Sequence, residues 1–262
     1  MLYILVFVSG AIVGSFLNVC IFRLPKEESV VFPGSHCQLC NKPIAAWDNI
    51  PILSFFILKG CCRYCKTKIS PQYPLVEFLS AIFFVLFYFY FGLTVKGVLY
   101  LLLTLALLTQ TFIDFRHRII PDAITLPGMV IGLIASAVFP SLHGKSLWWS
   151  GLLSSVIGLL VGGGFFYITG MLTEMILKKE AIGGGDIKLI AMIGALLGLA
   201  GVAWTIFFSS ILGSVAGIYA RIKHGDEHIP YGPYIAVGAF FYLFFGERII
   251  SWYIQSMGMY GY

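Results

Sequence analysis

Apolar stretches long enough to cross a membrane recur along nearly the whole chain. Of its 262 residues, 59% are hydrophobic and 11% are charged, whereas soluble domains have roughly 45–50% apolar and about 25% charged residues. A membrane helix needs about 20 mostly apolar residues. We predict such helices at 1–22, 77–93, 97–114, 123–140, 147–173, 187–202, 204–221 and 233–253. Because lipid leaves backbone polar groups without partners, every span must be helical.

The predicted fold is therefore an all-α polytopic membrane protein with about eight transmembrane helices. The boundary between 187–202 and 204–221 is the weakest, and seven spans remain if one shorter segment is re-entrant. The first 22 residues lack a basic start and a small-residue cleavage site. We interpret them as a retained membrane helix, not a removable signal peptide.

The distribution of basic residues predicts the orientation. Loops at 23–76, 115–122, 174–188 and 221–232 hold fourteen of the 17 Lys and Arg residues. The positive-inside rule then places these loops in the cytoplasm and both termini outside. The net charge of +5 is explained by this orientation. No basic run with interleaved aromatic residues is present, so we predict no nucleic-acid partner.

Residues 23–76 differ from the rest of the chain. They contain six prolines and five of the six cysteines. We predict three parts: a first transmembrane helix at 1–22, a small soluble cytoplasmic insert at 23–76, and a multi-helix membrane domain at 77–262. An insert this short has a small hydrophobic core, so it needs a bound metal or disulfide bonds to be stable.

Two C-x-x-C pairs in the insert predict a metal site. "CQLC" supplies Cys37 and Cys40, and "CRYC" supplies Cys62 and Cys65. This spacing is typical of a four-thiolate structural zinc site. Two disulfides are the alternative, but a cytoplasmic location keeps thiols reduced. Cys61 is an alternative ligand.

Two acids mark the predicted cytoplasmic edge of the membrane. "TFIDFRHRIIPD" places Asp114 at the end of one span, and "GGGDIKL" places Asp186 at the start of another. If the two helices pack together, the carboxylates can share a proton and activate water, as in an aspartic protease. The glycines before Asp186 would let a substrate strand approach the backbone closely.

Simpler interpretations of these acids remain open. Asp186 could be an N-cap or a partner of the helix dipole. Asp114 could pair with Arg116 or Arg118, and Asp122 has the position of a helix cap.

The motifs taken together resemble the type IV prepilin peptidase family. The resemblance rests on six motifs in order along the chain: "GSFLNVCIFRLP" (14–25), the double C-x-x-C insert with "WDNIPILSF" (47–55), "YPLVE" (73–77), "IDFRHRIIPD" (113–122), "GGGDIKL" (183–189) and "IPYGPYIA" (229–236). Any one of them is weak evidence, but six in order are specific.

This resemblance implies an enzyme of the bacterial inner membrane with Asp114 and Asp186 as its catalytic pair. Gly183 and Gly185 match the glycines of the family's G-x-G-D motif, and Glu77 is a candidate for attracting a basic leader. The implied substrates are prepilins or pseudopilins of type IV pili, type II secretion or competence, cut after a glycine on the cytoplasmic side. S-adenosylmethionine-dependent N-methylation of the new N-terminus, usually phenylalanine, is implied as a second activity.

Two rival functions fit the sequence less well. A presenilin-type protease also uses G-x-G-D, but here Asp114 follows Ile113 rather than a tyrosine, and no Pro-Ala-Leu motif is present. A transporter or channel would place its acids near the membrane centre. We would also expect internal repeats in the sequence of a transporter. The sequence shows no such repeats.

Overall fold

The structure, a computed structural model, describes residues 1–178, 182–224 and 229–256. These residues are predominantly helical, and their only extended pairing consists of two isolated bridges in the insert. The helices are α1 Leu2–Arg23, α2 Leu53–Ile57, α3 Gln72–Phe91, α4 Val95–His117, α5 Asp122–Val138, α6 Trp148–Leu177, α7 Gly184–His224, α8 Gly232–Phe241 and α9 Glu247–Ser256. The predicted all-helical class is confirmed.

Within the described part of the chain, five helices are long and apolar enough to cross a membrane. They are α1, α3, α4, α6 and α7, while α5 and α8 are shorter apolar helices. A multi-pass membrane protein is therefore supported, and the count of eight spans stays a prediction. The predicted spans 187–202 and 204–221 both lie in α7, which is interrupted at Gly198 (φ 68°) rather than at Ala203.

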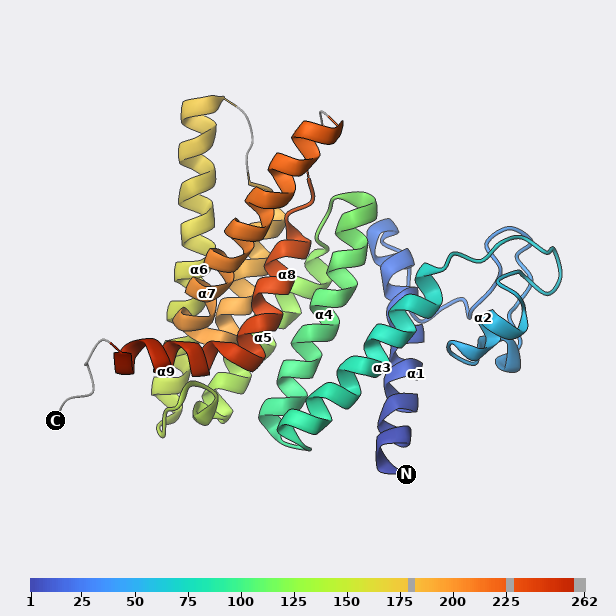
Figure 1. The fold of residues 1–262 in the computed structure, drawn as a ribbon, viewed down its shortest axis with the longest axis horizontal. Helices are drawn as coiled ribbons and strands as arrows, with labels where there is room; N and C mark the ends of the chain where they lie inside the picture. The colour runs from blue at the N-terminus through green and yellow to red at the C-terminus, as the bar shows by residue number, and fades with distance from the viewer. Residues whose placement is uncertain (179–181, 225–228, 257–262) are drawn as a thin grey trace. The chain divides into compact units, whose positions relative to one another are not determined.

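The predicted single span at 233–253 is divided in the structure. Helix α8 ends at Phe241, a π-helical segment covers Tyr242–Gly246, and α9 follows. A Cβ atom on Gly246 would collide with the Tyr242 ring, so the tight turn there requires glycine. Helix α9 then runs off at an angle from α8 (Figure 1).

Contacts group the chain into two units, Met1–Ile113 and Asp114–Tyr262. The predicted boundaries at 22 and 76 are not tested by this division and stay predictions. In the first unit, α1 packs on α3 through small residues. A Cβ on Gly14 would lie 2.6 Å from the Glu77 Cα atom, so the two helix backbones nearly touch. Asn18 Nδ2 adds a hydrogen bond of 3.0 Å to the Tyr73 carbonyl oxygen.

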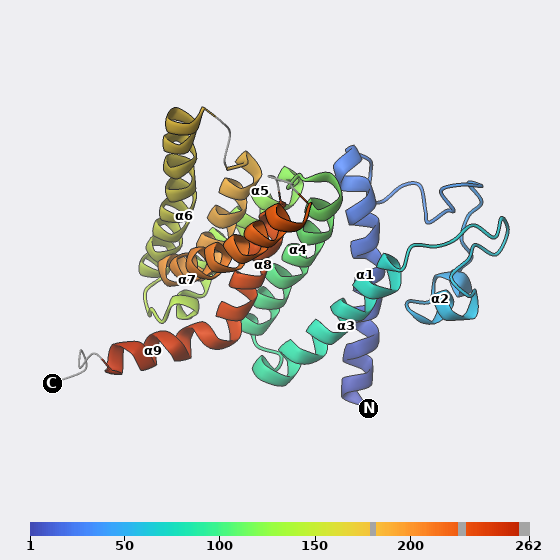
Figure 2. The same ribbon diagram turned by 45° about the horizontal axis from the view of Figure 1, so that its top comes forward.

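In the second unit, α7 contacts α5, α6 and α8 (Figures 1 and 2). Glycines bring these helices close together. Cβ atoms on Gly158 of α6 and on Gly194 of α7 would each collide with the other residue's backbone. On the α5 side, a Cβ on Gly132 would lie 2.9 Å from the Ala195 Cβ. In lipid the hydrophobic effect does not drive helices together, so close contacts of this kind stabilise their association.

The contact between α1 and α3 predicts that Gly14→Ala destabilises the protein. The added Cβ must push two backbones apart, which costs about 1–3 kcal/mol and exceeds the gain of up to about 1 kcal/mol in helix propensity. Thermal unfolding in detergent should show a lower midpoint. Gly164→Ala is the matched control because a Cβ there meets nothing within 4 Å. Equal midpoints for the two variants would contradict the packing described.

Candidate functional site

Asp114 lies in the last turn of α4 and is buried, with 5% of its surface exposed. The backbone N–H of Gly232 donates a hydrogen bond of 3.0 Å to its Oδ2 atom. Gly232 is the first residue of α8. A Cβ on Gly232 would lie 2.7 Å from the same carboxylate oxygen, so only glycine allows this contact.

The segment before α8 is fixed by Tyr231. Its hydroxyl donates to Ser209 Oγ at 3.0 Å, and its ring lies against Gly213, where a Cβ would come within 2.7 Å. Both partners belong to the second half of α7. This anchoring positions Gly232 for its contact with Asp114.

Asp186 is the third residue of α7 and is partly buried. Its backbone N–H donates to the Gly183 carbonyl oxygen at 3.0 Å. The glycines leave the approach to the carboxylate open: a Cβ on Gly184 would meet nothing within 4 Å, and one on Gly183 would meet only the Asp186 Oδ2 atom, at 3.4 Å. Asp186 therefore stands in the first turn of the helix, with little side-chain bulk preceding it.

Ile120 packs beside both acids. A Cβ on Gly185 would lie 2.9 Å from the Ile120 Cβ, and one on Gly232 would lie 3.4 Å from its Cδ1. Ile120 thus contacts Gly185, which precedes Asp186, and Gly232, whose N–H donates to Asp114. Through Ile120, the structure places the two acids singled out in the sequence at one end of the second unit.

Asp122, interpreted from the sequence as a helix cap, has a different partner. It is the first residue of α5. Each of its carboxylate oxygens accepts a hydrogen bond of 2.7 Å from Lys188 Nζ. Lys188 comes two residues after Asp186, so this ion pair joins the starts of α5 and α7.

The four cysteines of the insert form one cluster in the first unit. The sulfur atoms of Cys37, Cys40, Cys62 and Cys65 all lie within 4.8 Å of one another. All six cysteines of the chain are free thiols. The cluster could hold a metal ion, as the double C-x-x-C pattern predicted.

The two C-x-x-C turns have the same local geometry. The N–H of Cys37 donates to the Lys42 carbonyl and that of Cys62 to the Thr67 carbonyl. The residue after each second cysteine has a positive φ, 54° at Asn41 and 58° at Lys66. Cys61 pairs its backbone with Lys68, as His36 does with Pro43 in the other turn. Cys61 is outside the cluster.

Backbone donors in these turns favour thiolates. The N–H of Cys40, followed by that of Leu39, lowers the pKa of Cys37 to about 6. The N–H groups of Cys65 and Tyr64 likewise lower the pKa of Cys62. The turns therefore favour the thiolate, which is the form that binds metal, at the first cysteine of each pair.

Glu77 lies in the first unit and not in the unit that holds the two aspartates. Its Oε2 atom accepts a hydrogen bond of 2.7 Å from the Ile52 N–H. Ile52 has φ 64° and ψ −54°, a backbone conformation that is rare for a β-branched residue. In the structure, Glu77 therefore attaches the insert to α3. A role of Glu77 toward a basic leader stays a prediction.

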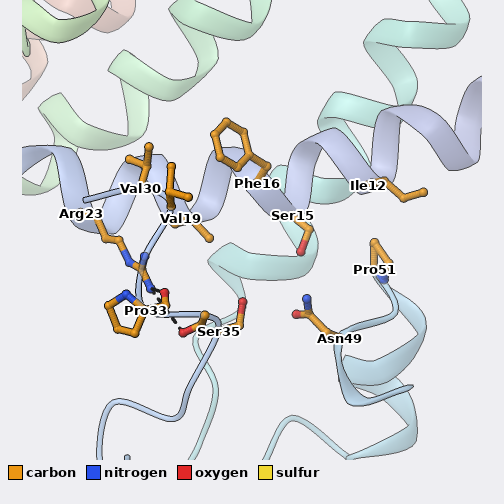
Figure 3. A pocket seen from close by; sticks show the side chains of 12 residues that line it. Ile12, Ser15, Phe16, Val19, Arg23, Val30, Pro33, Ser35, Asn49 and Pro51 are labelled. Atoms are coloured by element: carbon orange, nitrogen blue, oxygen red, sulfur yellow. Dashed lines mark hydrogen bonds between the residues drawn. The ribbon is translucent and has the colours of Figure 1, made fainter. Parts of the chain in front are cut away.

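A cavity of about 330 Å³ lies between α1 and the insert (Figure 3). The α1 wall runs from Ile12 to Arg23, and Ser15 and Asn49 face the cavity from opposite sides. Arg23 closes one end, because its guanidinium donates to the carbonyl oxygens of Ser29 at 2.9 Å and Pro33 at 2.7 Å. This cavity was not predictable from a local sequence pattern, because its walls come from separate segments.

Gly232, whose N–H donates to Asp114, is a site residue that the sequence motifs did not identify. Its motif, "IPYGPYIA", was noted as part of the resemblance without a role for this glycine. The glycine directly before Pro233 was the available signal.

Comparison with known proteins agrees with these features. Residues 8–91 match the model of the bacterial peptidase A24 N-terminal domain, and residues 101–218 match that of the type IV leader peptidase family. No solved structure matches the chain.

Curated relatives match over nearly their whole length. A prepilin leader peptidase/N-methyltransferase of Pseudomonas putida is 33% identical over an alignment of 276 positions, gaps included. The alignment covers 96% of this chain and 93% of the relative. Proteins of the same name from Pseudomonas aeruginosa and Neisseria gonorrhoeae are each 35% identical over 277 residues. They cover 95% and 94% of this chain, and 92% and 93% of the relatives. The chain therefore belongs to the type IV leader peptidase family.

Proposed function

We propose that the protein is an aspartic endopeptidase that removes the basic leader from type IV prepilins or pseudopilins. The observation that carries this proposal is geometric: Ile120 packs on Gly185, which precedes Asp186, and on Gly232, whose N–H donates to Asp114. Both acids stand at helix ends, on the side that the distribution of basic residues assigns to the cytoplasm. The protein would act at the inner membrane of a bacterium, where a substrate helix inserted in lipid presents its leader junction at this depth.

The chemistry follows from the repulsion between the two carboxylates. Two such groups do not both ionise, so they share one proton. The ionised carboxylate takes a proton from a water molecule, whose oxygen bonds to the carbonyl carbon of the scissile peptide. The protonated carboxyl donates a hydrogen bond to the carbonyl oxygen. The C–N bond then breaks as a proton passes to the departing amine, which becomes the N-terminus of the mature pilin.

Residues around the pair have supporting roles. The Gly232 N–H fixes one oxygen of Asp114, which leaves the other oxygen for water or substrate. The exposed glycines Gly183 and Gly184 allow an extended peptide to approach Asp186 without meeting a Cβ atom. Gly185 packs on Ile120. Its role is therefore to form part of the inner wall of the site, not to contact the substrate.

The four-cysteine cluster is proposed to bind a structural zinc ion. Four thiolates complete a tetrahedral zinc shell and leave no open position for catalysis. The residues that would hold the ion are Cys37, Cys40, Cys62 and Cys65, whose sulfur atoms are already gathered. The ion would join the two halves of the insert.

N-methylation of the new N-terminus is proposed as the second activity, since the relatives carry that name. It needs S-adenosylmethionine, which supplies the methyl group when bound. The cavity of about 330 Å³ beside α1 is within the size range of small-ligand sites, about 300–1,000 Å³. Its apolar α1 wall, the Ser15 hydroxyl and the Asn49 amide fit a ligand with both apolar and polar parts. These residues are the proposed binding site for this cofactor.

Asp114→Asn and Asp186→Asn should each lower the rate of prepilin cleavage by at least about 100-fold, because each removes a proton-transfer group. The measurement is loss of the leader, followed by mass spectrometry, from a purified prepilin in detergent. Glu174→Gln, an exposed acid of α6, is the matched control and should cleave normally. Full cleavage by either aspartate variant, with the fold intact, would refute the pair.

Metal analysis should find about one zinc ion per chain, with the ion lost in Cys37→Ser and in Cys62→Ser because each removes one of four ligands. Cys61→Ser should keep its zinc, since Cys61 lies outside the cluster. An equal loss of zinc in Cys61→Ser, or a wild-type protein purified without zinc, would contradict this assignment.

Asn49→Ala should weaken binding of S-adenosylmethionine by about tenfold, the effect of one lost hydrogen bond. Equilibrium dialysis with radiolabelled cofactor measures this directly and without turnover. The variant should still remove leaders, because Asn49 is not in the unit that holds the aspartates. Gln255→Ala, which truncates an exposed amide elsewhere, serves as control. Unchanged binding by Asn49→Ala would place the cofactor outside this cavity.

A further inference from the structure

The ion pair between Asp122 and Lys188 lies at the end of the contact between α5 and α7. Further along, Gly128 of α5 faces Met192, and Gly132 faces Ala195. Positions rise together in both helices, so α5 and α7 run parallel with their N-terminal ends at the same side. Lys188 therefore meets Asp122 where both helices begin, next to the turn that carries Asp186.

The ion pair sets the direction of Asp186. Two residues along an α-helix differ by about 200° around its axis. With Lys188 held toward α5, Asp186 is directed to the other side of α7. Gly185, three residues before Lys188, lies on the α5 side of the helix like Lys188 and packs on Ile120, which also contacts Gly232 beside Asp114.

On the α6 side the first turn of α7 has a looser contact, because a Cβ on Gly163 would lie 3.8 Å from the Ile187 carbonyl oxygen. Gly183 and Gly184 have no side chains, and a Cβ on Gly184 would meet nothing within 4 Å. The close glycine contacts with α5 begin only at Met192. On the α5 side, the first turn is therefore held by Lys188 and by the contact of Gly185 with Ile120.

We propose that Lys188 and Asp122 are positioning residues that fix the first turn of α7, so that Asp186 faces Asp114. This inference rests on the proposed peptidase function and adds two residues to it. Neither residue is assigned a contact with substrate.

The expected effects on folding stability and on cleavage rate differ in size, and this difference distinguishes a positioning role from a purely stabilising one. The side chains of Lys188 and Asp122 are 42% and 53% exposed, and an exposed ion pair contributes only about 0–1 kcal/mol to stability. A shift of about 1 Å in a catalytic group, in contrast, can cost about 100-fold in rate. Loss of the pair should therefore reduce cleavage much more than folding.

The test compares Lys188→Gln, Asp122→Asn and the charge-swapped double variant Asp122→Lys/Lys188→Asp with the wild-type protein. Each single variant should lower kcat for prepilin cleavage by about 10-fold to 100-fold with KM unchanged, because substrate binding is not altered. The unfolding midpoint should stay near that of the wild type. The double variant should recover part of the lost kcat, since it restores an ion pair of opposite sense. Lys178→Gln, at an exposed lysine in the same unit, should behave as wild type.

Amide hydrogen exchange over residues 182–190 provides a readout that does not depend on activity. Exchange at the first turn of α7 should be faster in the single variants and near normal in the double variant. Wild-type kcat in the single variants, a double variant no better than either, or unfolding of the single variants would overturn the proposal. A wild-type protein that fails to cleave prepilin would instead refute the peptidase function, while hydrogen exchange would still decide whether the pair orders α7.

Discussion

Close backbone packing around α7 is the constraint on which the second unit depends. Lipid offers no hydrophobic gain for helix association, so helices in a membrane associate through small residues that let their backbones touch. Gly158 against Gly194 joins α6 to α7, and Gly132 against Ala195 joins α5 to it. A helix held on two sides in this way has a defined position, which is the condition for placing one carboxylate within reach of another.

The polar groups at the edge of this packed core form a connected arrangement. Tyr231 anchors the start of α8 on α7, and Gly232 then donates to Asp114. Ile120 fills the space beside Gly185 and Gly232. A buried carboxylate is costly unless it is hydrogen-bonded. The position of Asp114 is therefore explained by a backbone donor from a segment more than a hundred residues away in the sequence.

The first unit has a separate organisation. Glu77 ties the insert to α3 through Ile52, and Arg23 ties it to the end of α1. The cysteine cluster lies within the insert itself. We infer a division of labour, with proteolysis in the second unit and cofactor and metal binding in the first. The family match agrees with two parts, since separate models cover residues 8–91 and 101–218.

Much of this arrangement was predictable from local sequence. The helical class follows from span length and hydrophobicity, and the cysteine cluster follows from the C-x-x-C spacing. The location of Asp114 and Asp186 at one edge of the membrane stays a prediction from the loop charges. Tertiary contacts could not be predicted in this way. The Gly232 donor, the partner of Lys188 and the cavity beside α1 each join segments far apart in the chain, and a pattern within one segment contains no information about its partner. The break in α7 was predicted at residue 203 rather than at Gly198 because the apolar residues continue on both sides of Gly198.

A cross-linking experiment tests the central claim, that Asp114 and Asp186 meet in one site. The double variant Asp114→Cys/Asp186→Cys is made with Cys20 and Cys61 replaced by serine and the four cluster cysteines retained. A short thiol-specific cross-linker is then applied in native membranes, and the linked peptides are identified by mass spectrometry. We expect an efficient link between positions 114 and 186, and little between 114 and 188 in the corresponding Asp114→Cys/Lys188→Cys protein. Absence of the 114–186 link, or equal yields for the two pairs, would contradict it.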